Sequence, residues 1–141
     1  LRYLYLHDNN IRGTIPPQLG EMKKLTHLYL HGNNIIGTIP EELFHATNLE
    51  DLGLNDNSIT GTLPAAIGKV TSLRYLHLDD NGMQGTIPER FYCLEQLYDL
   101  RINSNAFSGY ISTLIGSLTT LEYCNLHRNE FNSTIPTEIG K

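Results

Sequence analysis

The stretch LRYLYLHDNNIRGTIPPQLGEMKK, residues 1–24, is followed at once by LTHLYLHGNNIIGTIPEELFHATN, residues 25–48. The two stretches share leucine at their first, fourth and sixth positions, asparagine at the ninth, glycine at the thirteenth and Ile-Pro at the fifteenth and sixteenth. Stretches with closely similar spacing begin at residues 49, 73, 97 and 121. An internal repeat of this length indicates a stack of similar units, each of which buries its apolar side on the next.

The repeat divides the whole chain into the units 1–24, 25–48, 49–72, 73–96, 97–120 and 121–141, with no linker or insertion. Numbered from 1 to 24 in each unit, positions 1, 4, 6, 11, 15 and 19 are apolar throughout, as is position 22 in the five complete units. These positions form the predicted core. It includes Leu1, Leu4 and Leu6, and also Cys124, whose thiol at position 4 of the last unit is expected to act as a small buried hydrophobe.

The apolar spacing predicts the local structure of a unit. Leucine at positions 4 and 6 alternates with polar residues at positions 3, 5 and 7, as in a short strand with one buried face. Equivalent strands that stack in one direction form a parallel sheet, here with one uncovered face. Proline at position 16 or 17 then begins a segment too short for a regular α-helix, so a single 3₁₀ or α turn is expected. Glycine at position 20 is expected to end it, in Gly20, Gly68, Gly116 and Gly140.

Asparagine occupies position 9 of every unit. The chain turns away from the strand there and leaves backbone groups without a partner, which a buried amide satisfies through its donors and its acceptor. We therefore predict a structural ladder made of Asn9, Asn33, Asn57, Asn81, Asn105 and Asn129.

The unit LRYLYLHDNNIRGTIPPQLGEMKK resembles the plant-type leucine-rich repeat, LxxLxLxxNxLxGxIPxxLGxLxx, and the resemblance covers all 141 residues. It implies an α/β fold: a right-handed solenoid of six 24-residue units, with a concave parallel β-sheet, short 3₁₀ or helical turns on the convex side and a second short strand beside each main strand. It also implies similarity to the ectodomains of receptor-like kinases and receptor-like proteins and to polygalacturonase inhibitors. Members of this family usually bind peptides, proteins or glycans, outside the cell or at its surface.

The chain departs from that family at its ends. The cysteine-bearing caps of the family are missing, there is no kinase domain, and the sequence begins at position 1 of a unit and stops at position 21. We expect an internal slice of a longer array, with any signal peptide or membrane anchor elsewhere. Receptor kinase, receptor-like protein, inhibitor and scaffold all remain open as the parent protein.

The uncovered face is predicted to be a recognition surface. Five of the eight tyrosines lie at positions 3 and 5, and five of the six histidines lie at positions 3, 5 and 7. Tyrosine offers a large, rigid and amphipathic contact area, although strand surfaces favour it in any case. The predicted ligand-binding residues are Tyr3, Tyr5, His7, His27, Tyr29, His31, Asp51, Asn55, Tyr75, His77, Asp79, Asp99, Arg101, Tyr123 and His127. Gly53 is expected to leave a gap that seats a side chain of the ligand.

The charge of the chain bears on its partners. Its formal net charge is -5, which argues against nucleic acid, and the acidic residues gather in the middle units, where they would attract a basic partner. No run of about 18 apolar residues occurs, so the sequence predicts no membrane segment. The predicted partner is a protein or peptide, or else a glycan.

Catalysis and metal binding are weaker interpretations. The predicted sheet is open to water and the sequence contains no GxSxG, HExxH or P-loop motif, so neither an enzyme nor a cofactor is expected. His7 and His31 on adjacent strands, with Asp8 nearby, suit zinc, and Asp56, Asp79 and Asp80 suit calcium. Adventitious binding competes with both interpretations, and no built metal site is predicted.

A structural or ice-binding solenoid is the alternative function. Position 14 carries a row of threonines, interrupted by Tyr110, but the irregular residues at position 12 weaken this interpretation. The row consists of Thr14, Thr38, Thr62, Thr86 and Thr134.

Two further features are local. The sequon Asn132-Ser133-Thr134 makes Asn132 a candidate for N-glycosylation. Cys93 lies at position 21, on the outer side, so no disulfide with Cys124 is expected.

Overall fold

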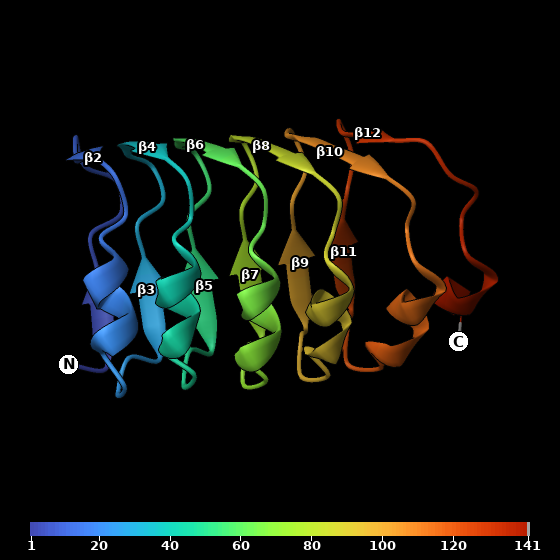
Figure 1. Ribbon diagram of the computed structural model, residues 1–141, viewed down its shortest axis with the longest axis horizontal. Coiled ribbons are helices and arrows are strands. Elements are labelled where there is room, and N and C mark those ends of the chain that lie inside the picture. Colours follow the sequence, from blue (N-terminus) through green and yellow to red (C-terminus); the bar gives the residue numbers. More distant parts are fainter. Residues whose placement is uncertain (141) are drawn as a thin grey trace.

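Six turns of chain follow one another along a single axis, and each carries two short strands and one 3₁₀ helix (Figure 1). This computed structural model describes residues 1–140. The main strands are β1 (Tyr3–Tyr5), β3 (His27–Tyr29), β5 (Asp51–Gly53), β7 (Tyr75–His77), β9 (Asp99–Arg101) and β11 (Tyr123–Asn125). The second strands are β2 (Arg12–Gly13), β4 (Asn34–Gly37), β6 (Ser58–Gly61), β8 (Gly82–Gly85), β10 (Ala106–Gly109) and β12 (Glu130–Phe131). The 3₁₀ helices are η1 (Pro17–Glu21), η2 (Glu41–His45), η3 (Ala65–Lys69), η4 (Glu89–Cys93), η5 (Thr113–Ser117) and η6 (Thr137–Gly140).

Both sets of strands form six-stranded parallel sheets. In the main sheet Tyr3 pairs with His27 and Tyr5 with Tyr29, so the register equals the repeat and like positions stand side by side. In the second sheet Arg12 pairs with Asn34, which is two residues short of the repeat. The 3₁₀ helices lie on the other side of the units from the main sheet (Figure 1). This arrangement confirms the predicted solenoid and leaves the outer face of the main sheet without a covering layer.

The core runs along the axis between the sheets and the helices. At positions 1, 4 and 6 of the second unit, Leu25, Leu28 and Leu30 are buried, as are their equivalents in the three units that follow. Burial of a leucine side chain contributes about 1.5–3 kcal/mol, so the repeated apolar rows supply the main stabilisation. The prediction fails in the end units, where Leu1 is 70% exposed and Cys124 is also exposed. Each inner unit is covered by two neighbours, whereas the first and last described units have one.

The asparagines at position 9 join consecutive units. Asn33 donates from Nδ2 to the carbonyls of Leu6 and Leu30, both at 2.9 Å, and its Oδ1 accepts from the backbone N–H of Ile11 at 2.9 Å. The same pattern recurs at Asn57, Asn81, Asn105 and Asn129, whereas Asn9 donates to carbonyls of its own unit. The amide N–H groups and the amide oxygen of each inter-unit asparagine therefore bond to backbone groups that the turn leaves unpaired.

Gly20, Gly68 and Gly116 do not end their 3₁₀ helices, which corrects the prediction at these positions, whereas Gly140 is the last residue of η6. Helix η1 continues through Gly20 to Glu21. A Cβ atom on Gly20 would lie 1.8 Å from the carbonyl oxygen of Glu42 in the next unit, and one on Gly68 would lie 2.3 Å from that of Arg90. Glycine is required there because two helices approach closely. Position 20 alternates between glycine and an aromatic ring over five units, as Gly20, Phe44, Gly68, Tyr92 and Gly116.

No helix among residues 1–140 has the length and apolar character needed to cross a membrane.

Candidate ligand-binding face

The outward side chains at positions 3, 5 and 7 of the six units form the uncovered side of the main sheet, which we call the concave face. Positions 3 and 5 lie on the main strands, and position 7 lies two residues after their ends. The fifteen residues predicted for recognition all belong to these three rows. The structure thus gathers them on one surface, but their environments differ from the first units to the last.

Six rings over β1 and β3 form a compact cluster, which we call the aromatic block: Tyr3, Tyr5, His7, His27, Tyr29 and His31. Tyr5 stacks on Tyr29 with ring centroids 4.7 Å apart and an interplanar angle of 18°. His7 stacks on His31 at 4.6 Å and 15°. The stacking follows from the register, because parallel strands are about 4.8 Å apart and like positions face each other. Pairs of this kind contribute roughly 0.5–1.5 kcal/mol each, so the block is ordered before any partner arrives.

The aromatic block is also accessible. Tyr3 is 52% exposed and Tyr5 is 50% exposed, while the other four rings are half-buried. Burial and the neighbouring His7 lower the pKa of His31, which favours its neutral form. Ordered and exposed tyrosine rings are typical of the residues that contribute most to a protein interface.

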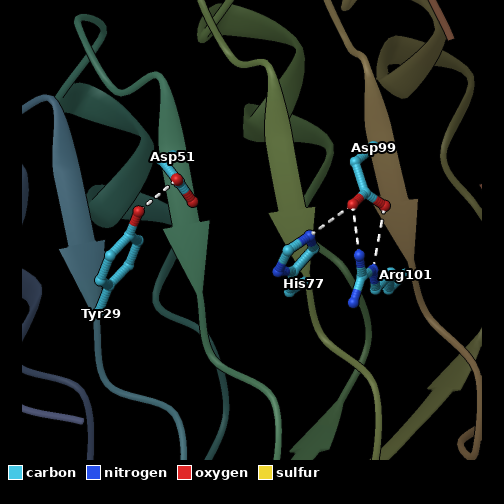
Figure 2. A network of polar contacts seen from close by, with 5 residues as sticks. All are labelled: Tyr29, Asp51, His77, Asp99 and Arg101. Carbon is cyan, nitrogen blue, oxygen red and sulfur yellow. Dashed lines mark hydrogen bonds and ion pairs between the residues drawn. The ribbon is translucent and has the colours of Figure 1, made fainter. Parts of the chain in front are cut away.

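Tyr29 reaches across to the next strand (Figure 2). Its hydroxyl donates a hydrogen bond to Asp51 Oδ2 at 2.5 Å. Burial and this bond raise the pKa of Tyr29, so the phenol remains a donor at neutral pH. The predicted gap at Gly53 is absent: a Cβ there would lie 3.4 Å from Tyr29 Cδ1 and 3.1 Å from His31 Nδ1, and Gly53 is buried. Glycine makes room for Tyr29 and His31 themselves.

A second network lies on β7 and β9 (Figure 2). Arg101 holds Asp99 through two hydrogen bonds, from Nε at 3.1 Å and from Nη2 at 2.7 Å. His77 Nε2 lies 3.2 Å from Asp99 Oδ2, though without hydrogen-bond geometry. The Asp99 side chain is only 7% exposed, and its hydrogen bonds raise the pKa of Arg101. Asp99 is therefore already neutralised within the chain, and it adds little to any attraction for a basic partner.

The backbone conformation helps to explain why aspartate occurs at position 8. Asp8, Asp56 and Asp80 adopt φ values of 55°, 52° and 50°, in the left-handed region. Aspartate tolerates this conformation better than most residues because its short side chain bonds locally. The turn thus favours aspartate at these positions without requiring it, since Ser104 and Arg128 adopt the same conformation at position 8 of the last two units. Asp79, at position 7, does face outward, and its partial burial raises its pKa.

Sequence reasoning missed Tyr98, at position 2. Its ring packs edge-on against Tyr75 at 5.8 Å and Tyr123 at 5.6 Å, which links two predicted residues into one aromatic run. The Tyr98 hydroxyl donates to Glu122 Oε2 at 3.0 Å, and this bond raises the pKa of Tyr98 to about 12. The signal in the sequence was the tyrosine itself, at a position where the other units carry arginine, threonine or glutamate.

A shallow depression of about 390 Å³ lies over β9 and β11. It is lined by Asp79, Asp99, Arg101, Asn103, Glu122, Tyr123, Cys124 and Asn125. Among these, Asn103 Oδ1 and Asp79 Oδ1 are buried polar atoms without a hydrogen-bond partner in the described chain. A ligand would reach these two buried acceptors only after the Asp79 and Asn103 side chains turn outward.

One group in the described residues has the spacing of metal ligands. His7, Asp8 and His31 each offer a ligand atom, and these atoms all lie within 4.8 Å of one another. Asp56, Asp79 and Asp80, considered for calcium, do not form such a group in residues 1–140.

The threonine row at position 14 has a packing role. The Cγ2 methyl groups of Thr14, Thr38, Thr62 and Thr86 lie 2.7–2.9 Å from where a Cβ would stand on the glycine of the following unit. These glycines have positive φ values, from 79° to 82°. The ordered row therefore follows from stacking of the units. Ice binding remains an alternative based on the sequence.

Comparison with protein families identifies the repeat as a leucine-rich repeat. Residues 1–45 match a model described as Leucine Rich repeats (2 copies), and residues 32–83 and 47–107 match a model described as Leucine rich repeat. No curated protein matches the chain.

Three solved structures similar to this chain are plant receptors. The ectodomain of the membrane receptor kinase GASSHO1/SCHENGEN3 from Arabidopsis thaliana, in complex with CASPARIAN STRIP INTEGRITY FACTOR 2, is 38% identical, with a TM-score of 0.98 over 99% of this chain and 17% of that one. The plant peptide hormone receptor RGFR1 in complex with RGF2 is 36% identical, with a TM-score of 0.97 over 99% and 22%. The Arabidopsis receptor kinase HAESA ectodomain, in complex with an extended IDA peptide hormone, is 29% identical, with a TM-score of 0.85 over 99% and 27%. The chain thus spans between a sixth and just over a quarter of these receptor chains.

Proposed function

Because the chain belongs to the plant-type leucine-rich repeat family, we propose that it is a non-catalytic recognition module that binds a peptide or protein on its concave face. The receptors to which it is similar are described as complexes with peptide hormones in two cases and with a named factor in the third. We further propose that the parent protein acts outside the cell, as a receptor-like protein, with a secreted inhibitor as the second possibility.

The observation that carries this proposal is the aromatic block. Tyr5 and Tyr29 are already stacked, so binding orders little that was free before, which lowers the entropic cost of association. Half of the Tyr5 surface is exposed and available to a partner. We expect a planar, aliphatic or cationic group of the ligand to lie on these rings.

The far end of the concave face offers a different chemistry. Asp79 and Asn103 hold buried acceptor oxygens that lack partners and become available if these side chains turn outward, and Glu122 adds a carboxylate at the edge of the depression. Backbone N–H groups or a lysine of an extended ligand would satisfy them. A ligand that crosses the strands would therefore place its apolar part over β1 and β3 and its donors over β9 and β11.

The experiment is a selection of displayed peptides on the purified protein, followed by measurement of the affinity of the enriched peptides. Tyr5→Ala and Tyr29→Ala are expected to weaken binding about tenfold or more, as truncation of an interface anchor does. Tyr110→Ala is the matched control, because Tyr110 is 63% exposed but lies at position 14, off the concave face. Equal affinity of Tyr5→Ala and the unaltered protein, or loss of binding in Tyr110→Ala, contradicts the proposal.

A further inference from the structure

We propose that His7, Asp8 and His31 form a binding site for one zinc ion at the edge of the concave face. One ligand atom from each residue lies within 4.8 Å of the other two. Ligand atoms around a tetrahedral zinc lie roughly 3.4 Å apart, given zinc–nitrogen and zinc–oxygen distances of about 2.0–2.2 Å. To bind one ion, the two stacked rings, whose planes differ by 15°, must turn so that one nitrogen of each points to a common centre. This proposal does not depend on the proposed recognition of a peptide or protein.

The two imidazoles are held in place by the sheet. His7 and His31 occupy position 7 after neighbouring strands and stack at 4.6 Å. The register of the sheet thus sets the two rings side by side, and imidazole nitrogen is a common ligand of zinc. The Nδ1 atom of His7 is buried and has no hydrogen-bond partner. Such an atom is the kind of unsatisfied group that a ligand completes.

The carboxylate is placed by the turn and by a glycine. Asp8 adopts the left-handed conformation, and its backbone N–H donates to the carbonyl of His31 at 2.9 Å. Its Oδ1 atom would lie 2.4 Å from a Cβ on Gly32, so glycine at that position leaves the room that the carboxylate occupies. Among the six units, only the second has glycine at position 8. Thus the second unit keeps the two histidines adjacent and also opens the space for Asp8 beside them.

The chemistry of the donors selects the ion. Two imidazoles and one carboxylate suit zinc and the neighbouring transition metals, whereas calcium and magnesium prefer oxygen ligands throughout. Three protein ligands leave the fourth position of a tetrahedral zinc open, and Asp8 is exposed, so that position is available to water.

Isothermal titration of the metal-free protein with zinc tests the proposal, with cobalt absorption as an independent readout of tetrahedral coordination. We expect one zinc per chain, and affinity about tenfold or more weaker in His31→Gln and in Asp8→Asn. His127→Gln and Asp56→Asn are the matched controls: His127 shares position 7 but hydrogen-bonds Asn125, and Asp56 shares the backbone conformation of Asp8. Both controls should bind zinc like the unaltered protein.

The outcomes distinguish a zinc-binding site from a pair of histidines that stack only for packing. Equal zinc binding in His31→Gln and His127→Gln, or no stoichiometric binding at all, means adventitious metal only, with the histidines stacked for packing alone. Thermal unfolding without metal checks that each variant is folded. If His31→Gln fails that check, Asp8→Asn carries the test, because its side chain is exposed and asparagine accepts the same turn conformation.

Discussion

Tyr29 hydrogen-bonds Asp51 on the neighbouring strand by extending over Gly53 and beside His31. Asp51 is thereby held by a phenol, and Gly53 stays buried beneath a ring. The aromatic block and the third unit are thus connected within the chain itself, before any ligand binds. This connection is the basis of the first two predictions.

Replacing Tyr29 with phenylalanine should lower the free energy of unfolding by about 0.5–1.5 kcal/mol, the usual net contribution of one hydrogen bond. The ring and its stacking on Tyr5 remain, so only the bond to Asp51 is lost. Urea unfolding measures the difference. Tyr5→Phe is the control, since the Tyr5 hydroxyl makes no hydrogen bond to the described residues, and it should change stability little. A loss of the same size in Tyr5→Phe would show that the Asp51 bond is not the cause.

Alkaline pH should destabilise the protein through the same group. The pKa of Tyr29 is raised above 10.0 by burial and by Asp51, so above pH 10 the unfolded chain releases a phenol proton that the native chain keeps. The native state then binds more protons than the unfolded state, and the free energy of unfolding falls as pH rises past 10. Tyr29→Phe should remove much of this slope. Tyr98→Phe should remove less, because Tyr98, although its pKa is raised to about 12, lies in an exposed contact with Glu122.

The effect of a Gly→Ala substitution at position 20 on stability should depend on whether the helix of the next unit packs against that glycine. Gly20→Ala places a Cβ 1.8 Å from the backbone oxygen of Glu42, so the two helices must separate, at a cost of about 1–3 kcal/mol. Gly140→Ala has nothing within 4 Å and should be close to neutral. Thermal unfolding of the two variants gives the comparison. If both are equally stable, close packing of the helices is not what requires glycine.

Loss of an inter-unit amide should be more damaging than loss of a terminal one. Asn57→Ala removes bonds to the Leu30 and Leu54 carbonyls and leaves the N–H of Ile35 without its acceptor. We expect destabilisation on the order of 3 kcal/mol, because buried backbone groups lose their partners. Asn9→Ala removes only bonds within its own unit and should cost less. Hydrogen exchange of the Ile35 amide reports the local effect. Unchanged protection would contradict this account.

The repeat made the fold predictable because a spacing of 24 residues fixes the register of the main sheet and with it the inward direction of Leu28 and Leu52. It also placed Tyr5 beside Tyr29. The role of Gly20 was not predictable, since it depends on the distance to Glu42 in the next unit, and neither was the position of Tyr29 over Gly53. The recurrence of Asp and Gly at position 8 is a sequence signal for a left-handed turn. Cys124 was assigned to the core from its position alone, which takes no account of how many neighbours a unit has.

The alternation of glycine and aromatic rings at position 20 gives the convex side a longer repeat than the sequence motif suggests. Gly20 fits Glu42, Gly68 fits Arg90 and Gly116 fits Glu138, while Phe44 and Tyr92 fill the intervening positions. Removal of the second unit would bring Gly20 against a unit that was matched to a phenylalanine, whereas removal of the second and third units together would leave the order intact. Gly140, at position 20 of the sixth unit, does not continue the alternation, but over the first five units the packing repeat is the 48-residue pair, and shortening by one pair is the change that this packing tolerates best.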